Sequence, residues 1–142
     1  MTRAEPAAFR GAFTLIEVLL VVAIIGILSA LVVAGIANAS SDAKLVLARQ
    51  QQAVIQEALN AWIASTTLSA ASNAYNGQNT AAGKIGLFKA YIDTNARWFS
   101  EGLEYNGASL QTANMKSINQ TLTFSTWTNG TYPTVGLQPV GN

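Results

Sequence analysis

The sequence predicts an α+β protein in which a long N-terminal helix packs on a small C-terminal antiparallel sheet or hairpin. The first half of this helix is predicted to span a membrane and the second half to be amphipathic. An uncharged apolar run covers Val18–Ile36, a helix-forming stretch follows at 38–65, and an alternating pattern around an Asn-Gly turn covers 121–135. Helix and strand patterns that are segregated along a chain are typical of this fold class.

The apolar run is long enough to cross a bilayer. No charged residue occurs between Val18 and Ile36, and at 1.5 Å per residue these positions form a helix of roughly 28 Å, about one hydrocarbon thickness. Glu17 stands at the entrance of the run rather than at its centre. There the carboxylate lies near the membrane interface and near the helix N-terminus, where the helix dipole favours negative charge.

The helix is predicted to continue beyond the span. Polar residues enter at 38–42, and 44–65 is rich in Ala, Leu, Gln, Arg and Glu, which favour helix. An apolar stripe recurs there at helical spacing, and we expect it to face the core of a soluble head. The stripe consists of Leu47, Val54, Ala58 and Ile63, joined by Val46, Ile55, Leu59 and Trp62, while Gln50, Gln51, Gln52, Glu57 and Asn60 lie mostly outside it.

The middle of the chain carries weaker signals. Small and polar residues over 66–83, interrupted by Asn76-Gly77, predict a long loop. Apolar residues spaced over 85–104 predict one or two short helical or irregular segments that cover a core.

The last segment predicts a β-hairpin. Residues 121–127 alternate, Asn129-Gly130 supplies a tight turn, and 131–135 returns. Leu122 and Phe124 are expected to share one face, whereas Trp127 breaks the alternation and marks a bulge or the end of the strand. Pro133 is expected on an edge strand because proline cannot donate a ladder hydrogen bond. A lone hairpin is marginal, so a further strand is expected within 104–120.

Composition excludes several classes of function. The 142 residues include no cysteine and no histidine, which removes disulfides, thiol chemistry, Cys/His metal sites and imidazole acid–base catalysis. Only 11% of residues are charged and the formal net charge is +1, so no basic surface for nucleic acid is predicted. No spacing of Ser, Lys, Asp or Glu indicates a catalytic set, and we expect no enzyme.

The segment Arg10-Gly11-Ala12-Phe13-Thr14-Leu15-Ile16-Glu17 resembles the N-terminus of type IV pilins and of the pseudopilins of type II secretion. In that family a prepilin peptidase removes a leader just before the Phe and usually methylates the new amine. The resemblance implies a leader at 1–12 and methylation at Phe13. The chain departs from the common pattern because Ala12 takes the place of Gly, with Gly11 one position earlier. The cut therefore falls after Ala12 or after Gly11, and the spacing to Glu17 favours Ala12/Phe13.

Glu17 is the candidate assembly residue. A carboxylate buried in a bundle of apolar helices must find a partner, because an unpaired buried charge costs several kcal/mol. The amine freed at Phe13 of a neighbouring subunit is such a partner, and the pair would fix the axial register between subunits. The alternative is that Glu17 only caps the first helical turn.

Small residues recur every fourth position within the apolar run. Gly26, Ala30 and Ala34 form a ridge on one helix face, and such ridges allow helices to approach closely. The alternative is simple composition, because alanine is abundant throughout the chain.

Metal binding is the weakest expectation. Major pseudopilins bind calcium through a C-terminal loop, but no carboxylate follows Glu104 here. Asp93, Glu101 and backbone oxygens leave a weaker oxygen-ligand calcium site open. We otherwise expect no metal and no cofactor.

These observations predict a leader at 1–12, a transmembrane and assembly helix at 13–37, its amphipathic continuation at 38–65, and a variable loop with a small β-containing head at 66–142. The resemblance implies a structural subunit held in the bacterial inner membrane by one span, with its head in the periplasm, and assembled into a periplasmic or cell-surface fibre. Its expected partners are other copies or related pilin-like subunits, prepilin peptidase and an inner-membrane assembly platform.

Two choices stay open at this stage. The subunit is a type II secretion pseudopilin, a type IV pilus subunit or a minor tip component, and the lack of a C-terminal cysteine pair, the size and the compact tail favour a pseudopilin-like subunit. Ala37-Asn38-Ala39 also matches the small-x-small pattern of an ordinary signal cleavage site. The alternative function is therefore an exported or membrane-anchored periplasmic binding domain.

Overall fold

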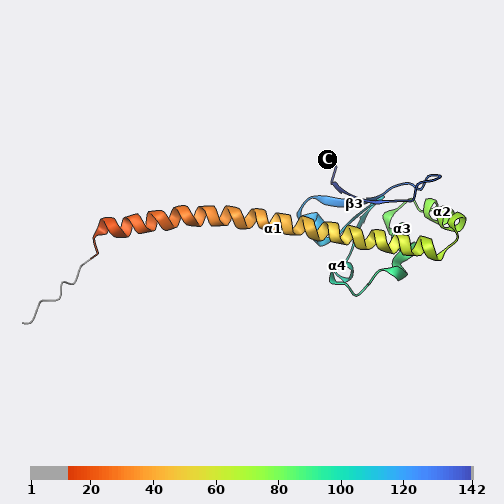
Figure 1. Ribbon diagram of the computed structural model, residues 1–142, viewed down its shortest axis with the longest axis horizontal. Coiled ribbons are helices and arrows are strands. Elements are labelled where there is room, and N and C mark those ends of the chain that lie inside the picture. Colours follow the sequence, from red (N-terminus) through yellow and green to blue (C-terminus); the bar gives the residue numbers. More distant parts are fainter. Residues whose placement is uncertain (1–12, 142) are drawn as a thin grey trace, which may run out of the picture. The chain divides into compact units, whose positions relative to one another are not determined.

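The structure, a computed structural model, describes residues 13–141 (Figure 1). The chain divides into two compact units, Met1–Ala39 and Ser40–Asn142, and the second is called the head below. A single helix, α1, runs from Leu15 to Ser65 through the boundary between them. The fold class is thus the predicted one, a long N-terminal helix with a small C-terminal antiparallel sheet.

Helix α1 has defined signals at both ends. At its start the Glu17 backbone N–H donates to the Thr14 hydroxyl at 3.3 Å, so Thr14 serves as the N-cap. At its end the Ser65 and Thr66 hydroxyls donate to the Trp62 carbonyl at 2.8 and 2.9 Å, which satisfies a carbonyl that the terminating helix leaves free. The sequence has no proline from position 7 to position 132, so nothing interrupts the helix.

The head contains, besides the last part of α1, short helices and strands. In chain order these are α2 (Leu68–Asn76), α3 (Ala81–Phe88), the 3-10 turn η1 (Lys89–Tyr91), α4 (Arg97–Ser100), β1 (Glu104–Asn106), β2 (Ser109–Gln111), α5 (Ala113–Ser117), β3 (Gln120–Phe124) and β4 (Val135–Pro139).

The strands form one antiparallel sheet in the order β1-β2-β3-β4. Leu110 pairs with Leu122 between β2 and β3, and Phe124 pairs with Val135 between β3 and β4. These four side chains are buried, which confirms that Leu122 and Phe124 share the core face. The further strand expected within 104–120 is present as β1 and β2, joined by a tight turn.

The return strand of the hairpin starts later than predicted. Of the predicted 131–135, only Val135 belongs to β4, because the chain leaves the sheet after Phe124 to reach α2. There the Asn76 side chain binds both backbone polar groups of Trp127, accepting from its N–H at 3.3 Å and donating to its carbonyl at 3.0 Å. The Asn129-Gly130 turn forms within the resulting connection, between Thr128 and Thr131.

Pro133 was wrongly assigned to an edge strand. It lies in the β3–β4 connection, where its carbonyl accepts from the Gln56 side chain at 3.3 Å. The proline of edge strand β4 is Pro139.

The prediction of a loop over 66–83 was also wrong. Helix α2 fills most of this segment and α3 begins within it. Tertiary packing overrides the small, polar composition, because Ala71 and Tyr75 on one face of α2 are fully buried. Thr80 starts α3 by accepting a hydrogen bond from the Gly83 N–H at 3.1 Å.

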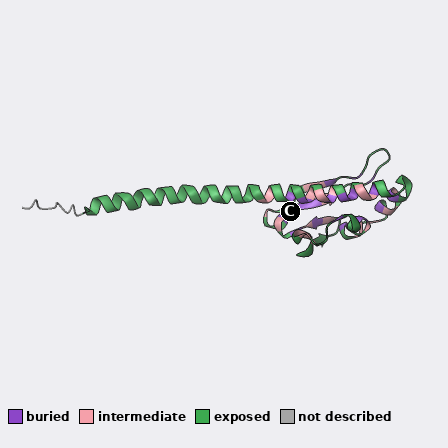
Figure 2. Cartoon of the chain, turned by 60° about the horizontal axis from the view of Figure 1, so that its bottom comes forward, coloured by how far each residue is buried: buried purple, intermediate pink, exposed green. Residues whose placement is uncertain are grey.

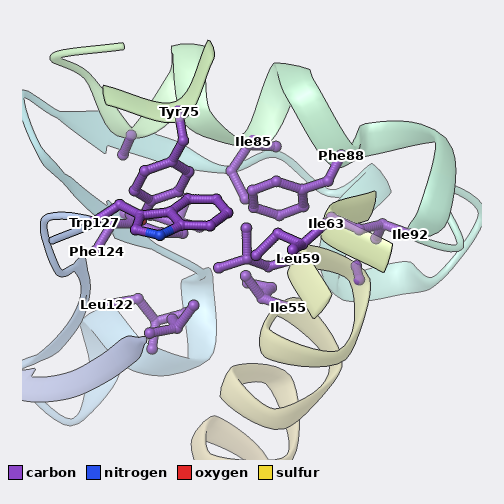
Figure 3. Packing of buried hydrophobic residues seen from close by; sticks show 14 of the residues in the cluster. Ile55, Leu59, Ile63, Tyr75, Ile85, Phe88, Ile92, Leu122, Phe124 and Trp127 are labelled. Atoms are coloured by element: carbon purple, nitrogen blue, oxygen red, sulfur yellow. The ribbon is translucent and has the colours of Figure 1, made fainter. Parts of the chain in front are cut away.

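The core of the head lies between α1, the helices that follow it and the sheet, as Figure 3 shows. Ile55, Leu59 and Ile63 point from α1 toward the aromatic rings of the core. Phe88 meets Phe124 with ring centroids 6.4 Å apart. Every buried hydrophobic residue of this cluster lies between Ala48 and Val135, so the described residues before Ser40 contribute none.

Part of the predicted stripe on α1 does face this core and part does not. Ala58 and Ile63 are buried as expected, but Val46 and Leu47 are 63% and 49% exposed. Gln51, expected outside the stripe, is buried and accepts a hydrogen bond from the Thr112 hydroxyl at 2.9 Å. The buried stripe therefore begins at Ala48, because the other elements of the head cover α1 only from about that turn onward.

Candidate functional site

The first part of α1 is exposed to solvent and mostly apolar. Every residue from Phe13 to Ala43 is exposed (Figure 2), and no charged residue occurs from Val18 to Ile36. A helix of this length and composition can cross a membrane. Exposed apolar surface on this scale marks a membrane or protein contact.

One polar side chain interrupts the run, and sequence analysis overlooked it. Ser29 is the sole polar residue between Val18 and Ile36, and its hydroxyl donates to the Ile25 carbonyl one turn earlier at 2.7 Å. A serine satisfied within its own helix needs no outside partner in an apolar surrounding. The run is therefore compatible with lipid along its full length.

Thr14 and Glu17 together start the helix. Glu17 lies three residues after the N-cap Thr14, and its backbone N–H reaches both the hydroxyl and the carbonyl of Thr14, at 3.3 and 3.0 Å. A Thr-x-x-Glu sequence at this position is the pattern of a capping box. The Glu17 side chain is exposed and forms no ion pair with the described residues. The geometry therefore fits the capping role and leaves the carboxylate accessible to a partner.

The processing residues lie at the edge of the described chain. Phe13 is 78% exposed and precedes the N-cap, so its backbone nitrogen is not needed by the helix. Gly11 and Ala12, where the cleavage is predicted, lie outside residues 13–141.

Gly26, Ala30 and Ala34 all lie on α1 and are exposed. An added Cβ at Gly26 would meet no atom of the described residues within 4 Å. The predicted use of this ridge in helix packing stays a prediction.

Asp93 and Glu101, the carboxylates considered for calcium, have other partners, and so does Glu104, the last carboxylate of the chain. Asp93 accepts from the Asn95 N–H at 3.0 Å, Glu101 pairs with Arg97 on α4, and Glu104 pairs with Lys116 at 2.8 Å. Residues 13–141 contain no group of three acidic, His or Cys side chains that could hold a metal.

A groove of about 1020 Å³ runs along the head between α1 and the β3–β4 connection. Its α1 wall includes Gln52 and Gln56, and its opposite wall includes Tyr132 and Pro133. The two glutamines link α1 to Val135, which also lines the groove: Gln52 donates to the Val135 carbonyl and Gln56 accepts from the Val135 N–H, both at 2.7 Å. These bonds occupy the outward-facing polar groups of Val135 at the edge of the sheet, which protects that edge from other strands.

Burial shifts the pKa of two neighbouring groups of the head, Tyr75 and Lys84. Burial raises the pKa of the Tyr75 phenol, whose hydroxyl donates to the Ser125 carbonyl at 3.1 Å. Burial also lowers the pKa of Lys84, whose ammonium lies 4.4 Å from the centre of the Tyr75 ring. These groups are packed into the structure and do not converge with other titratable groups on a reactive site.

The fold and this surface define a class of protein, an α+β head on a helix whose N-terminal part is apolar and exposed. The family model of the prokaryotic N-terminal methylation motif matches residues 9–33. This is the signal motif of type IV pilins and pseudopilins, so the chain carries a type IV pilin-like N-terminus of the kind that prepilin peptidase processes. Proteins with this motif are structural rather than catalytic.

The match ends at residue 33, so the head lies beyond it. No curated protein and no solved structure is detectably similar to the chain. The motif and the apolar helix together are consistent with anchoring in the inner membrane.

Proposed function

We propose that this protein is a structural subunit of a pilin-like fibre. It is stored in the bacterial inner membrane by a single span with its head in the periplasm. Prepilin peptidase cuts it between Ala12 and Phe13 and methylates the Phe13 amine. An inner-membrane assembly platform then adds it to other copies or to related pilin-like subunits, and the fibre is held together by the apolar part of α1.

The observation that carries this proposal is the exposed apolar surface from Phe13 to Ile36 directly at the methylation motif. A fully buried leucine or isoleucine side chain gains about 1.5–3 kcal/mol over an exposed one, so a surface of this size does not stay in water. Lipid covers it before assembly, and the same helices of neighbouring subunits cover it afterwards.

Glu17 distinguishes assembly from simple anchoring. A plain membrane span has no use for a carboxylate in its first turn beyond capping, and Thr14 already supplies a side-chain cap. In a bundle of helices the exposed Glu17 carboxylate gains a partner when the Phe13 amine of a neighbouring subunit lies against it. The charge pair then selects one axial register among the many that an apolar surface allows.

We place the fibre in type II secretion rather than in a type IV pilus. The sequence has no cysteine to close a disulfide-bonded C-terminal loop. The cargo, and the rank of this subunit within the fibre, are separate questions.

One observation favours the alternative of an exported binding domain. The compact head begins at Ser40, which is the residue that would become the N-terminus if an ordinary signal peptidase cut after Ala39. Such a cut would release the head without α1's apolar part, so the two proposals predict different mature chains.

The proposal is tested by replacing Glu17 in cells that contain the peptidase and the assembly platform. Glu17→Ala and the isosteric Glu17→Gln should insert into the membrane and be processed as the unchanged protein is. The fraction recovered in sheared fibres should fall by a factor on the order of ten or more, because each tenfold corresponds to about 1.4 kcal/mol and the lost charge pair exceeds that.

Glu57→Gln is the matched control. Glu57 is an exposed carboxylate on the same helix and forms no ion pair with the described residues, so its replacement should leave fibre yield unchanged. Normal fibre yield from both Glu17 variants would show that the Glu17 carboxylate does not set the axial register between subunits. Loss of membrane insertion would show that Glu17 acts before assembly.

A further inference from the structure

The head contains three Asn-Gly pairs, at 76–77, 106–107 and 129–130. Asparagine is a thermolabile residue, and glycine as its successor leaves the backbone nitrogen least hindered because it has no Cβ. In the reaction the glycine backbone nitrogen attacks the asparagine Cγ, ammonia leaves, and a cyclic succinimide forms. Water then opens the ring to aspartate or isoaspartate. The structure restrains the three pairs very differently.

The pair at Asn76-Gly77 is fixed on both reacting groups. The Asn76 amide binds the Trp127 backbone through its nitrogen at 3.0 Å and its oxygen at 3.3 Å. The Gly77 N–H, which holds the attacking nitrogen, donates to the Asn73 carbonyl at 3.0 Å at the end of α2. Neither group can reach the other unless the end of α2 opens.

The pair at Asn106-Gly107 is held through its backbone. Asn106 is the last residue of β1 and pairs with Ser109, whose hydroxyl donates to the Asn106 carbonyl at 2.8 Å. The Gly107 carbonyl accepts from the Ala81 N–H at 2.8 Å. The peptide unit that joins Asn106 to Gly107 is therefore anchored at its carbonyl, and the next peptide unit is anchored at the Gly107 carbonyl, although the Asn106 side chain is exposed.

The pair at Asn129-Gly130 has no comparable restraint. Both residues are exposed at the tip of the β3–β4 connection, and within residues 13–141 neither the Asn129 amide nor the Gly130 N–H has a hydrogen-bond partner. Gly130 has a φ of 84°, and an added Cβ there would meet no described atom within 4 Å. The turn is closed only by its neighbours, through the Thr131 N–H and the Thr128 carbonyl at 3.0 Å.

We propose that Asn129 is a site of spontaneous deamidation in the folded protein, with Asn106 slower and Asn76 protected. Conversion to aspartate adds one negative charge to a chain whose formal net charge is +1, and conversion to isoaspartate also lengthens the backbone of the turn. Both products change the loop that carries Tyr132 and one wall of the groove beside α1. In a subunit that stays for a long time in an assembly, deamidation would accumulate at Asn129.

The test is a comparison of the folded chain with the same chain in denaturant. The full-length protein is kept in mild detergent at neutral pH, a second sample is kept in concentrated urea, and peptide mapping follows aspartate and isoaspartate at each pair. In urea the three pairs should convert at similar rates. In the folded chain Asn129 should stay within a few-fold of its urea rate, whereas Asn76 should slow by a factor on the order of a hundred, because its reaction requires local opening.

Asn129→Gln provides an independent readout by isoelectric focusing. Glutamine cyclises far more slowly, so this variant should lose the acidic form that accumulates first in the unchanged protein. Acidic forms that accumulate equally fast in the variant would overturn the proposal. So would Asn76 or Asn106 converting as fast as Asn129 in the folded chain, or a folded chain in which Asn129 is as protected as Asn76. The outcome does not depend on fibre assembly.

Discussion

Removal of residues 1–39 should leave a folded, soluble head. Every buried hydrophobic residue of the described core lies between Ala48 and Val135, so the deletion removes no core side chain. The hydrogen bonds lost are confined to the new start of α1, where the first backbone N–H groups no longer have carbonyl partners in the preceding turn. These groups are exposed, and Ser40 and Ser41 can cap them. Loss of a helix cap costs about 1 kcal/mol.

For a domain of roughly a hundred residues, 1 kcal/mol shifts the melting temperature by about 4–8 °C. The fragment 40–142 should therefore unfold cooperatively within about 8 °C of the full chain in mild detergent, as followed by near-ultraviolet circular dichroism. Its tryptophan environment should be the same, because Trp127 packs within the head. A fragment without a cooperative transition, or with exposed apolar surface that binds dyes, would refute the assignment of the stability to the head alone.

Two further predictions concern the head. Gln56→Ala should lower the free energy of unfolding by about 1–3 kcal/mol in urea titrations, because it leaves the N–H of buried Val135 without a partner. The exposed Gln50→Ala should change the free energy of unfolding by less than about 0.5 kcal/mol. Equal effects of the two substitutions would contradict the role of Gln56 in binding Val135 at the edge of the sheet. Burial raises the pKa of Tyr75, so the folded state holds this proton more tightly, and its contribution to stability is lost as pH rises above about 10. Tyr75→Phe should flatten the fall in stability above that pH more than Tyr105→Phe does. Tyr75→Phe should also cost about 1 kcal/mol at neutral pH through the lost hydrogen bond, and an unchanged alkaline slope would show that other groups control it.

Periodicity predicted the elements whose signal is local. The uninterrupted helix followed from the apolar run and the helix-forming residues after it. Strand β3 followed from the alternation that starts at Thr121, although its partner strand β4 begins only at Val135. The motif at Phe13–Glu17 likewise identified the N-terminal segment, because its residues are contiguous. In each case the structure is decided by near neighbours in the sequence.

The errors arose where distant residues decide the structure. The composition of α2 predicts a loop, but the segment is helical because Tyr75 packs against Trp127, with ring centroids 6.0 Å apart. Gln51 was predicted to be exposed because it is polar, but it is buried because the distant Thr112 hydroxyl donates a hydrogen bond to it. The late start of β4 depends on Asn76 holding Trp127 away from the sheet. None of these contacts leaves a periodic trace in the sequence.

The mature N-terminus tests the central claim most directly. The protein should be produced with prepilin peptidase, and its N-terminal peptide should be identified by mass spectrometry. The account predicts a chain that begins at Phe13 and carries a methylated amine. A chain that begins at Ser40, or one that retains Met1, would contradict it.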